Sequence, residues 1–325
     1  MYTAAFRRCV ASRQVILMEG ALSERLKREY HLTLDPHVTM ARLYRDRVQA
    51  AALSSIWNQY IAIARRYGFP FLAATPTRRT NRETIALAGC GDSVIEGNVS
   101  LLQSVREQSG IEMYVGGQMG NRGNAYTLDG ALSRQEAYDF HSWTVERYQK
   151  AGVDFLYPSL IPSLPEALGI AQAIDPTGLP YILSFTIQGD GRLIDGTTIA
   201  DAIETIDSQT VNKPVCYMTN CVHPRFVLQA LTQPFNQTPL VHSRFAGIQA
   251  NAAALTYKEM DDSPVLLTSA PEELAVETLR LADLDQIRIW GGCCGTNDRH
   301  MEQIAKALLE RFPHTSSIQT KGDTP

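Results

Sequence analysis

The chain has 325 residues, of which 44% are hydrophobic and 20% charged, a composition typical of a soluble protein with a large core. Its net charge of −4 excludes a broad basic surface for nucleic acid or an anionic membrane. No run of about 18 apolar residues occurs, so we expect no membrane-spanning helix.

The leader, residues 1–13, carries three arginines and no acidic residue. It lacks the apolar core of a secretion signal, and we expect a short disordered lead-in, with a mitochondrial transit segment as the alternative. Six cysteines in a chain of this length do not indicate a disulfide scaffold. They favour metal binding or catalysis in a cytoplasmic protein.

Eight short apolar runs follow the leader and alternate with longer amphipathic segments. Each run is almost continuously apolar, as expected for parallel strands that are buried on both faces. The predicted strands are Gln14–Gly20, Phe69–Thr75, Met113–Met119, Asp154–Ser159, Tyr181–Ile187, Pro214–Asn220, Phe245–Asn251 and Gln286–Gly292.

Helical spacing of apolar residues predicts helices between these strands, including Val38–Tyr67, Arg134–Lys150 and Asp298–Arg311. Several of the predicted helices begin after a residue that can cap the helix. These capping residues are Asn81, Ser133 with Glu136 three positions later, and Asn297.

Strand–helix alternation over eight units predicts an α/β fold in which residues 14–312 form one domain, a (β/α)8 TIM barrel. An open doubly wound sheet is the alternative, but no Gly-x-Gly-x-x-Gly follows the first strand. The polar residues 313–325 predict a flexible tail.

Three cysteines follow predicted strands. Cys221 follows the sixth strand, and Cys293 and Cys294 follow the eighth. Active sites of such barrels lie at the carboxyl ends of the strands, so we expect the three sulfurs to converge there. Three thiolates can hold Zn²⁺ and leave the fourth tetrahedral position open, which is the catalytic arrangement.

Buried free cysteines often act only as small hydrophobic residues. We assign that role to Cys9, Cys90 and Cys216. A Cys-Cys pair between glycines at the end of a strand is harder to explain by packing, since glycine lets the backbone turn sharply there.

The segments Asn220-Cys221-x-His223-Pro224 and Gly292-Cys293-Cys294-Gly295-Thr296 resemble the two metal signatures of the zinc-dependent homocysteine S-methyltransferase family. The resemblance extends over nearly the whole chain and implies an eight-fold barrel. It also implies that Cys221, Cys293 and Cys294 bind Zn²⁺.

In the mechanism that this resemblance implies, the thiol of homocysteine becomes the fourth zinc ligand and is deprotonated. The thiolate then attacks the methyl group of a small sulfonium or ammonium donor and gives methionine. No catalytic residue is needed beyond the zinc-activated thiolate. The expected partners are a small-molecule thiol acceptor and a methyl donor, without nucleic acid or membrane, and a homo-oligomer stays open.

The family resemblance also identifies substrate-binding candidates, and some of them depart from the family's pattern. Glu19-Gly20-Ala21 stands where the family has an Asp-Gly-Gly-like turn, and Ser159-Leu160 replaces a pair that begins with glutamate. The missing glutamate weakens the case for an α-amino acid acceptor, because a buried ammonium group needs a partner. The predicted substrate-binding residues are Glu19, Gly20, Ala21, Thr75, Ser159, Asn220 and Asn251.

Further charged residues near the strand ends leave several interpretations open. Arg78 and Arg79 can bind a carboxylate or phosphate, or can lie in a solvated loop. Glu19 can replace the missing partner of the ammonium group, or can pair with an arginine. We expect structural roles for His223 and His300.

Three other functions stay open beside methyl transfer to homocysteine. The same zinc–thiolate transfer can serve a different thiol acceptor. The barrel can also bind zinc without catalysis, or hold a structural zinc with His223 as the fourth ligand.

Overall fold

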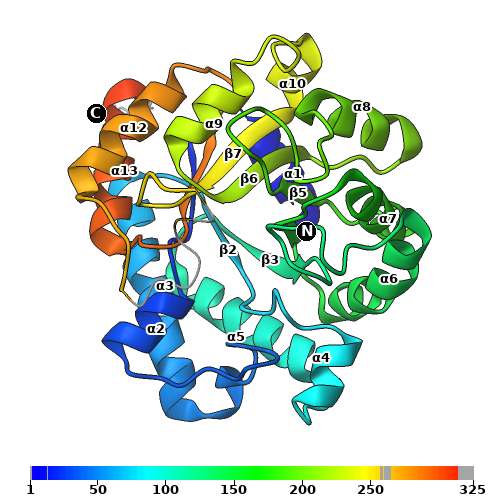
Figure 1. Cartoon of the computed structure of the whole chain (residues 1–325). Helices are drawn as coiled ribbons and strands as arrows, with labels where there is room; N and C mark the ends of the chain where they lie inside the picture. The colour runs from blue at the N-terminus through cyan, green and yellow to red at the C-terminus, as the bar shows by residue number, and fades with distance from the viewer. Residues whose placement is uncertain (1, 13, 257–258, 260–264, 314–325) are drawn as a thin grey trace, which may run out of the picture.

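Eight parallel strands form one barrel in the computed structural model, which describes residues 2–12, 14–256, 259 and 265–313 (Figure 1). Neighbouring strands pair in the order β4-β3-β2-β1-β8-β7-β6-β5. The parallel bridges Leu156–Tyr181 and Ile161–Phe185 join the β4 and β5 segments and close the ring. The predicted (β/α)8 TIM barrel is confirmed.

All eight predicted strands are present, and most are shorter than predicted because their ends turn into loops. The strands are β1 (Ile16–Met18), β2 (Phe71–Ala74), β3 (Met113–Gly120), β4 (Phe155–Ser159), β5 (Ile182–Phe185), β6 (Cys216–Val222), β7 (Phe245–Ala250) and β8 (Ile289–Gly292).

Helices surround the barrel (Figure 1). They are α1 (Tyr2–Ala11), α2 (Ser23–Glu29), α3 (Arg47–Tyr67), α4 (Arg82–Leu87), α5 (Val94–Ser109), α6 (Arg134–Ala151), α7 (Leu164–Ile174), α8 (Ile199–Gln209), α9 (Pro224–Leu231), α10 (Pro239–Arg244), α12 (Pro271–Ala282) and α13 (Asp298–Arg311). Short 3₁₀ helices occupy Leu43–Arg45 and Asp175–Thr177.

The predicted helix caps are confirmed. The side chains of Asn81, Ser133 and Asn297 accept hydrogen bonds from backbone N–H groups in the first turns of α4, α6 and α13. Among the described helices, none combines the length and the apolar character that crossing a bilayer requires.

The helix predicted at Val38–Tyr67 is correct only in its second part, α3. The carboxylate of Asp46 accepts hydrogen bonds from Val48 N and Gln49 N at 2.9 Å each, so the helix starts there. The preceding residues form turns and a 3₁₀ helix and contribute to the mouth of the barrel. Their apolar spacing reflects packing against the core rather than a helix.

The expectation of a disordered lead-in is wrong, because residues 2–11 form α1. Phe6 is fully buried, and its ring stacks on Phe155 with centroids 4.3 Å apart and meets the edge of Tyr114. Phe155 and Tyr114 lie near the amino ends of β4 and β3, so α1 covers the end of the barrel opposite the cysteines. Of the predicted tail, residues 314–325 lie outside the described residues.

Truncation of Phe6 tests the contribution of α1 to stability. Phe6→Ala leaves a cavity against Phe155, and we expect the free energy of unfolding to fall by about 3–5 kcal/mol. Urea denaturation followed by circular dichroism measures this change. Val211→Ala, at a side chain that is 93% exposed, is the control and should change stability by less than about 0.5 kcal/mol. An equally small change for Phe6→Ala would show that α1 does not stabilise the barrel.

Candidate metal centre

The three cysteines meet at the carboxyl ends of β6 and β8. Their sulfur atoms all lie within 4.8 Å of one another. Strand β7 separates the two strands, and Cys293 N donates a hydrogen bond of 2.7 Å to Ala250 O at the end of β7. The closed ring of parallel strands therefore brings together residues that lie 72 positions apart.

Local backbone conformation turns the sulfurs toward one another. Cys221 has a φ of 58°, in the left-handed region that residues other than glycine rarely adopt. Leu160, at the end of β4, has a φ of 59°, and Gly295 turns the chain after the cysteine pair with a φ of 79°. Strained backbone of this kind is concentrated at functional sites.

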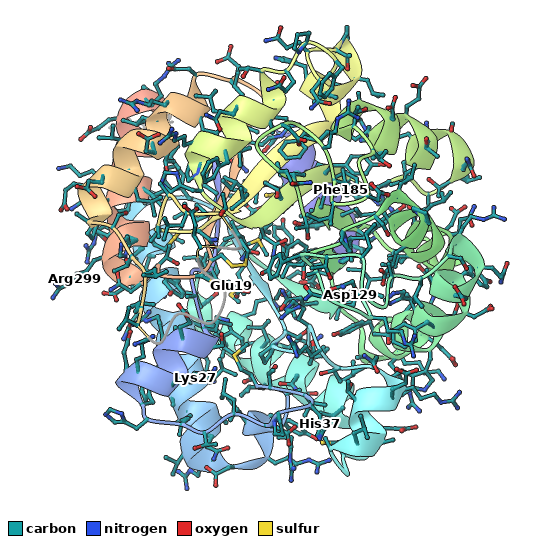
Figure 2. All side chains as sticks on the ribbon, in the orientation of Figure 1. Glu19, Lys27, His37, Asp129, Phe185 and Arg299 are labelled. Carbon is teal, nitrogen blue, oxygen red and sulfur yellow. A yellow bond between two sulfur atoms is a disulfide. The ribbon has the colours of Figure 1, made fainter. Side chains whose placement is uncertain are left out.

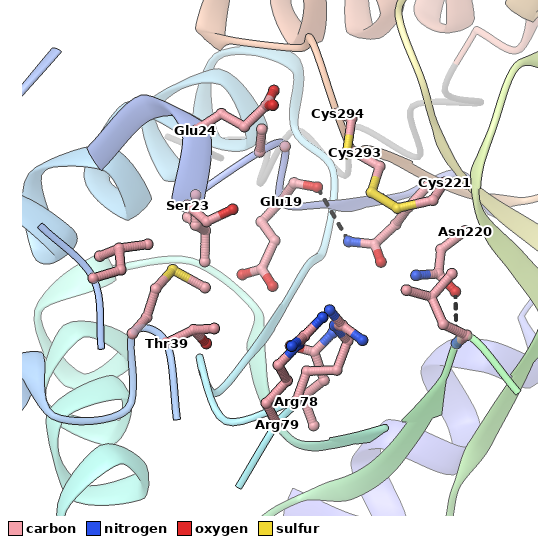
Figure 3. Close-up of a pocket in the computed structure, with 18 of the residues that line it drawn as sticks. Glu19, Ser23, Glu24, Thr39, Arg78, Arg79, Asn220, Cys221, Cys293 and Cys294 are labelled. Carbon is pink, nitrogen blue, oxygen red and sulfur yellow. Dashed lines mark hydrogen bonds between the residues drawn. A yellow bond between two sulfur atoms is a disulfide. The ribbon is translucent and has the colours of Figure 1, made fainter. Parts of the chain in front are cut away.

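Cys221 and Cys293 form a disulfide in this structure, with Cα atoms 5.4 Å apart, whereas Cys294 is a free thiol (Figure 3). A metal ion is bound by thiolates, so coordination by all three residues requires the reduced protein. Three soft sulfur donors in a cluster fit a thiophilic ion such as Zn²⁺.

The protein environment alone does not make Cys294 a thiolate at neutral pH. Burial, and after it the charge of Glu24, raise the pKa of the Cys294 thiol to about 11, against the lowering effect of Arg78. A bound cation would supply the missing stabilisation of the thiolate.

A cavity of about 500 Å³ opens beside the cysteine cluster (Figure 3). Of the predicted substrate-binding residues, Glu19, Gly20, Ala21 and Asn220 line it together with all three cysteines. Glu19 lies near the middle of the ring in end-on view, whereas Arg299 lies at its outer edge (Figure 2).

Thr75, Ser159 and Asn251 do not line this cavity, and all three are fully buried. Ser159 Oγ accepts a hydrogen bond of 3.1 Å from Gln118 Nε2, and the Thr75 hydroxyl accepts one from Gln118 N. These side chains support Gln118, which does line the cavity.

Asn220 is fixed by its neighbours. Its Oδ1 atom accepts hydrogen bonds from Ser184 Oγ at 2.6 Å and from Leu160 N at 3.1 Å. Both bonds use the carbonyl oxygen, so the amide group has a defined orientation at the cavity wall (Figure 3).

Glu19 is buried and accepts hydrogen bonds from Trp57 Nε1 at 2.9 Å and from Ala74 N at 3.1 Å. Burial raises the pKa of its carboxyl to about 8, against the lowering effect of these two bonds. Within the described part of the chain, no cation pairs with this carboxyl group. Burial without a cationic partner therefore favours the protonated form of this carboxyl group in the folded protein.

Several residues of the cavity wall were not predicted as substrate-binding residues. They come from β3 itself and from the loops after β1, β2 and β3, and include Leu34, Asp35, Met40, Arg78, Gln118 and Tyr126. The loop after β1 has no motif of its own in the sequence, and part of it was predicted as helix. Arg78 was recognised as an anion-binding candidate only.

His223 and His300 cap helices, as expected. His223 is the N-cap of α9, and its Nδ1 accepts a hydrogen bond from Arg225 N at 3.3 Å. His300 interacts with Asn297 at the start of α13 and with Ser269 O at 3.0 Å. Cys9, Cys90 and Cys216 are buried, as their assigned packing role requires.

Comparison with known proteins identifies a family and a fold that this chain resembles. The model of the family described as homocysteine S-methyltransferase matches residues 16–308. The metallated form of the Escherichia coli homocysteine methyltransferase MmuM has the same fold, with a TM-score of 0.73, 20% sequence identity and coverage of 93% of this chain and 99% of MmuM. The oxidised form of MmuM also gives a TM-score of 0.73 at 20% identity and covers 94% of this chain and 98% of that one.

Substitution of the cysteines tests the metal site. Cys221→Ser, Cys293→Ser and Cys294→Ser should each lose most of the metal bound by the reduced protein, because each removes one of three sulfur donors. Metal content after reduction, zinc loading and desalting measures this loss. Cys90→Ser is the control, since Cys90 lies outside the cluster, and should keep its metal. Unchanged metal content in the three cluster variants would contradict the site.

The raised pKa of Glu19 predicts a pH dependence of stability. Between its ordinary value of 4.5 and about 8, the folded protein binds more protons than the unfolded chain, so stability falls as pH rises through this window. The loss is at most about 1.4 kcal/mol per pH unit. Glu19→Gln should remove it while keeping an acceptor for Trp57.

Urea midpoints at pH 5 and pH 8 measure this effect. The midpoint of the wild type should fall more between the two pH values than that of Glu19→Gln, and exposed Glu107→Gln should behave as the wild type. Identical falls in all three proteins would show that the Glu19 carboxyl has an ordinary pKa.

Proposed function

The chain belongs to the homocysteine S-methyltransferase family and is an S-methyltransferase, and from this premise we propose that it is a zinc enzyme. In this proposal it transfers a methyl group from a small sulfonium or ammonium donor to the thiol of homocysteine and gives methionine. The observation that supports the proposal best is the cluster of Cys221, Cys293 and Cys294 at the wall of a cavity.

Each part of the site has a role in this proposal. The three cysteines would hold Zn²⁺ and leave one position open toward the cavity. Zinc, when bound, supplies the positive charge that keeps an acceptor thiol deprotonated at neutral pH. The acceptor thiol then needs no general base from the protein.

The protein's remaining contribution is alignment and exclusion of water. The amide of Asn220 is held at the wall by Ser184 and the backbone of Leu160, so it can orient a substrate without rearrangement. The cavity is large enough for an amino acid-sized thiol together with a small methyl donor. We expect the methyl group to pass directly from donor to thiolate, in line.

A second candidate is the same transfer to a different thiol. It is favoured by Ser159, which stands where the family has a glutamate and is engaged by Gln118 Nε2. This position provides no carboxylate for an α-ammonium group.

A panel of methyl donors tests the proposed reaction. The reduced, zinc-loaded protein should form labelled methionine from homocysteine and at least one of betaine, S-methylmethionine and S-adenosylmethionine carrying a labelled methyl group. Chelation of zinc should abolish the product, and added Zn²⁺ should restore it. Cys90→Ser should remain active, whereas Cys221→Ser should not.

Absence of methylated product with every donor and acceptor, in protein that demonstrably holds zinc, would contradict the proposal. It would favour a barrel that binds zinc without catalysis.

A further inference from the structure

Two arginines stand side by side on the cavity wall, directly after β2. Arg78 and Arg79 both line the cavity, and their side chains project into it from the same loop (Figure 3). The charge of Arg79 acts on the guanidinium group of Arg78. Within the described residues, no hydrogen bond or ion pair engages either guanidinium group. Arg42, also in this region, is by contrast paired with Asp35 at 3.1 Å.

Holding these two positive charges together costs free energy. Arg78 is half-buried, and its pKa is lowered, chiefly by burial and in addition by the charge of Arg79. Arginine stays protonated even so, which leaves a partly desolvated cation beside a like charge. An anion between the two groups would remove this cost.

The glycine at the end of β3 leaves room for the Arg78 side chain. A Cβ atom at Gly120, the last residue of β3, would lie 2.8 Å from Arg78 Cγ and 2.8 Å from Arg78 O. Glycine at this position therefore lets the Arg78 side chain pass over the end of β3 into the cavity. Arg78 lines the same cavity as the three cysteines of the cluster.

The carboxylates of the cavity wall are already engaged by the protein. Glu19 accepts hydrogen bonds from Trp57 Nε1 and Ala74 N, and Glu24 accepts one of 3.0 Å from Gly295 N. Asp35 accepts two backbone hydrogen bonds and pairs with Arg42. Among the described residues, the wall thus offers the unpaired positive charges of Arg78 and Arg79 to an oxyanion, and of its three carboxyl groups only Glu24 is partly exposed and without a cationic partner.

We propose that Arg78, assisted by Arg79, binds an oxyanion carried by the acceptor thiol. The acceptor class is then the thiol acids, in which a carboxylate or sulfonate lies a few bonds from the sulfur, and an α-ammonium group is dispensable. This inference rests on the proposed function. The sulfur binds at the cysteine cluster, and the oxyanion binds at the arginines by charge-assisted, bidentate hydrogen bonds.

Titration of the reduced, cobalt-substituted protein with a thiol panel tests this inference without any methyl donor. The thiolate-to-cobalt absorption reports entry of each sulfur into the open position. 4-Mercaptobutyrate, which is homocysteine without its amino group, should bind about as tightly as homocysteine. 3-Mercaptopropylamine, which lacks the carboxylate, should bind at least about 10-fold more weakly.

Substitutions distinguish the contribution of the oxyanion to binding from that of the sulfur. Arg78→Gln should weaken binding of 4-mercaptobutyrate and homocysteine by about 10- to 100-fold and leave neutral propanethiol unchanged, because only the charged contact is lost. Arg79→Gln should have a smaller effect in the same direction. Arg299→Gln, at the exposed edge of the molecule, is the matched control and should bind all thiols as the wild type does.

Calorimetry with 4-(methylthio)butanoate, the methylated product of 4-mercaptobutyrate, gives a second measurement that needs no metal–thiolate bond. The wild type should bind it more tightly than Arg78→Gln. 3-Mercaptopropanesulfonate in the cobalt titration distinguishes a general oxyanion site from one restricted to carboxylates.

Equal losses for charged and neutral thiols in Arg78→Gln, or tighter binding of the amine than of the acid, would overturn the inference. So would an effect confined to the KM of a carboxylate-bearing methyl donor, which would assign the arginines to the donor. Failure of every thiol to enter the cobalt site would instead contradict the proposed function, and the calorimetric comparison would still decide the role of Arg78.

Discussion

The convergence of strand ends in a closed parallel barrel is the constraint on which the site depends. Cys221 lies in β6, and Cys293 and Cys294 follow β8, so the cluster exists only while β7 holds these two strands in register. The left-handed backbone at Cys221 completes the arrangement. The packed core around the site, which includes two large clusters of buried side chains, holds the backbone in this strained conformation.

The two ends of the barrel are specialised in opposite ways. At the amino end, Phe6 of α1 packs on Phe155 and excludes water from the interior. At the carboxyl end, polar side chains such as Gln118 and Asn220 are held by hydrogen bonds around an open cavity. This division agrees with the general behaviour of such barrels, in which one end stabilises the fold and the other carries the chemistry.

Much of this arrangement could be predicted from the sequence, because its signals are local. Continuous apolar runs predicted all eight strands, and glycines around Cys293 and Cys294 indicated a turn at a strand end. The sequence did not reveal α1, since its ten residues form a helix that depends on docking Phe6 into the barrel. It also did not show which polar residues face the cavity.

Side-chain orientation explains why some predicted substrate-binding residues do not line the cavity. Ser159 and Thr75 lie at strand ends, where substrate contacts are expected, but their side chains point to Gln118 rather than to the cavity. A strand residue can face the barrel interior, the helix layer or the mouth, and spacing alone does not decide this at the last residue of a strand. The loop after β1 contributes Leu34 and Met40 by tertiary packing, which no short motif records.

The cysteine cluster and the arginine pair are built from different segments of the chain. The cysteines belong to β6 and to the residues after β8, whereas Arg78 and Arg79 belong to the loop between β2 and α4. A change in that loop leaves the sulfur donors untouched. Under the proposed assignment, mutation of this one short segment would change the range of acceptors and leave the metal site intact.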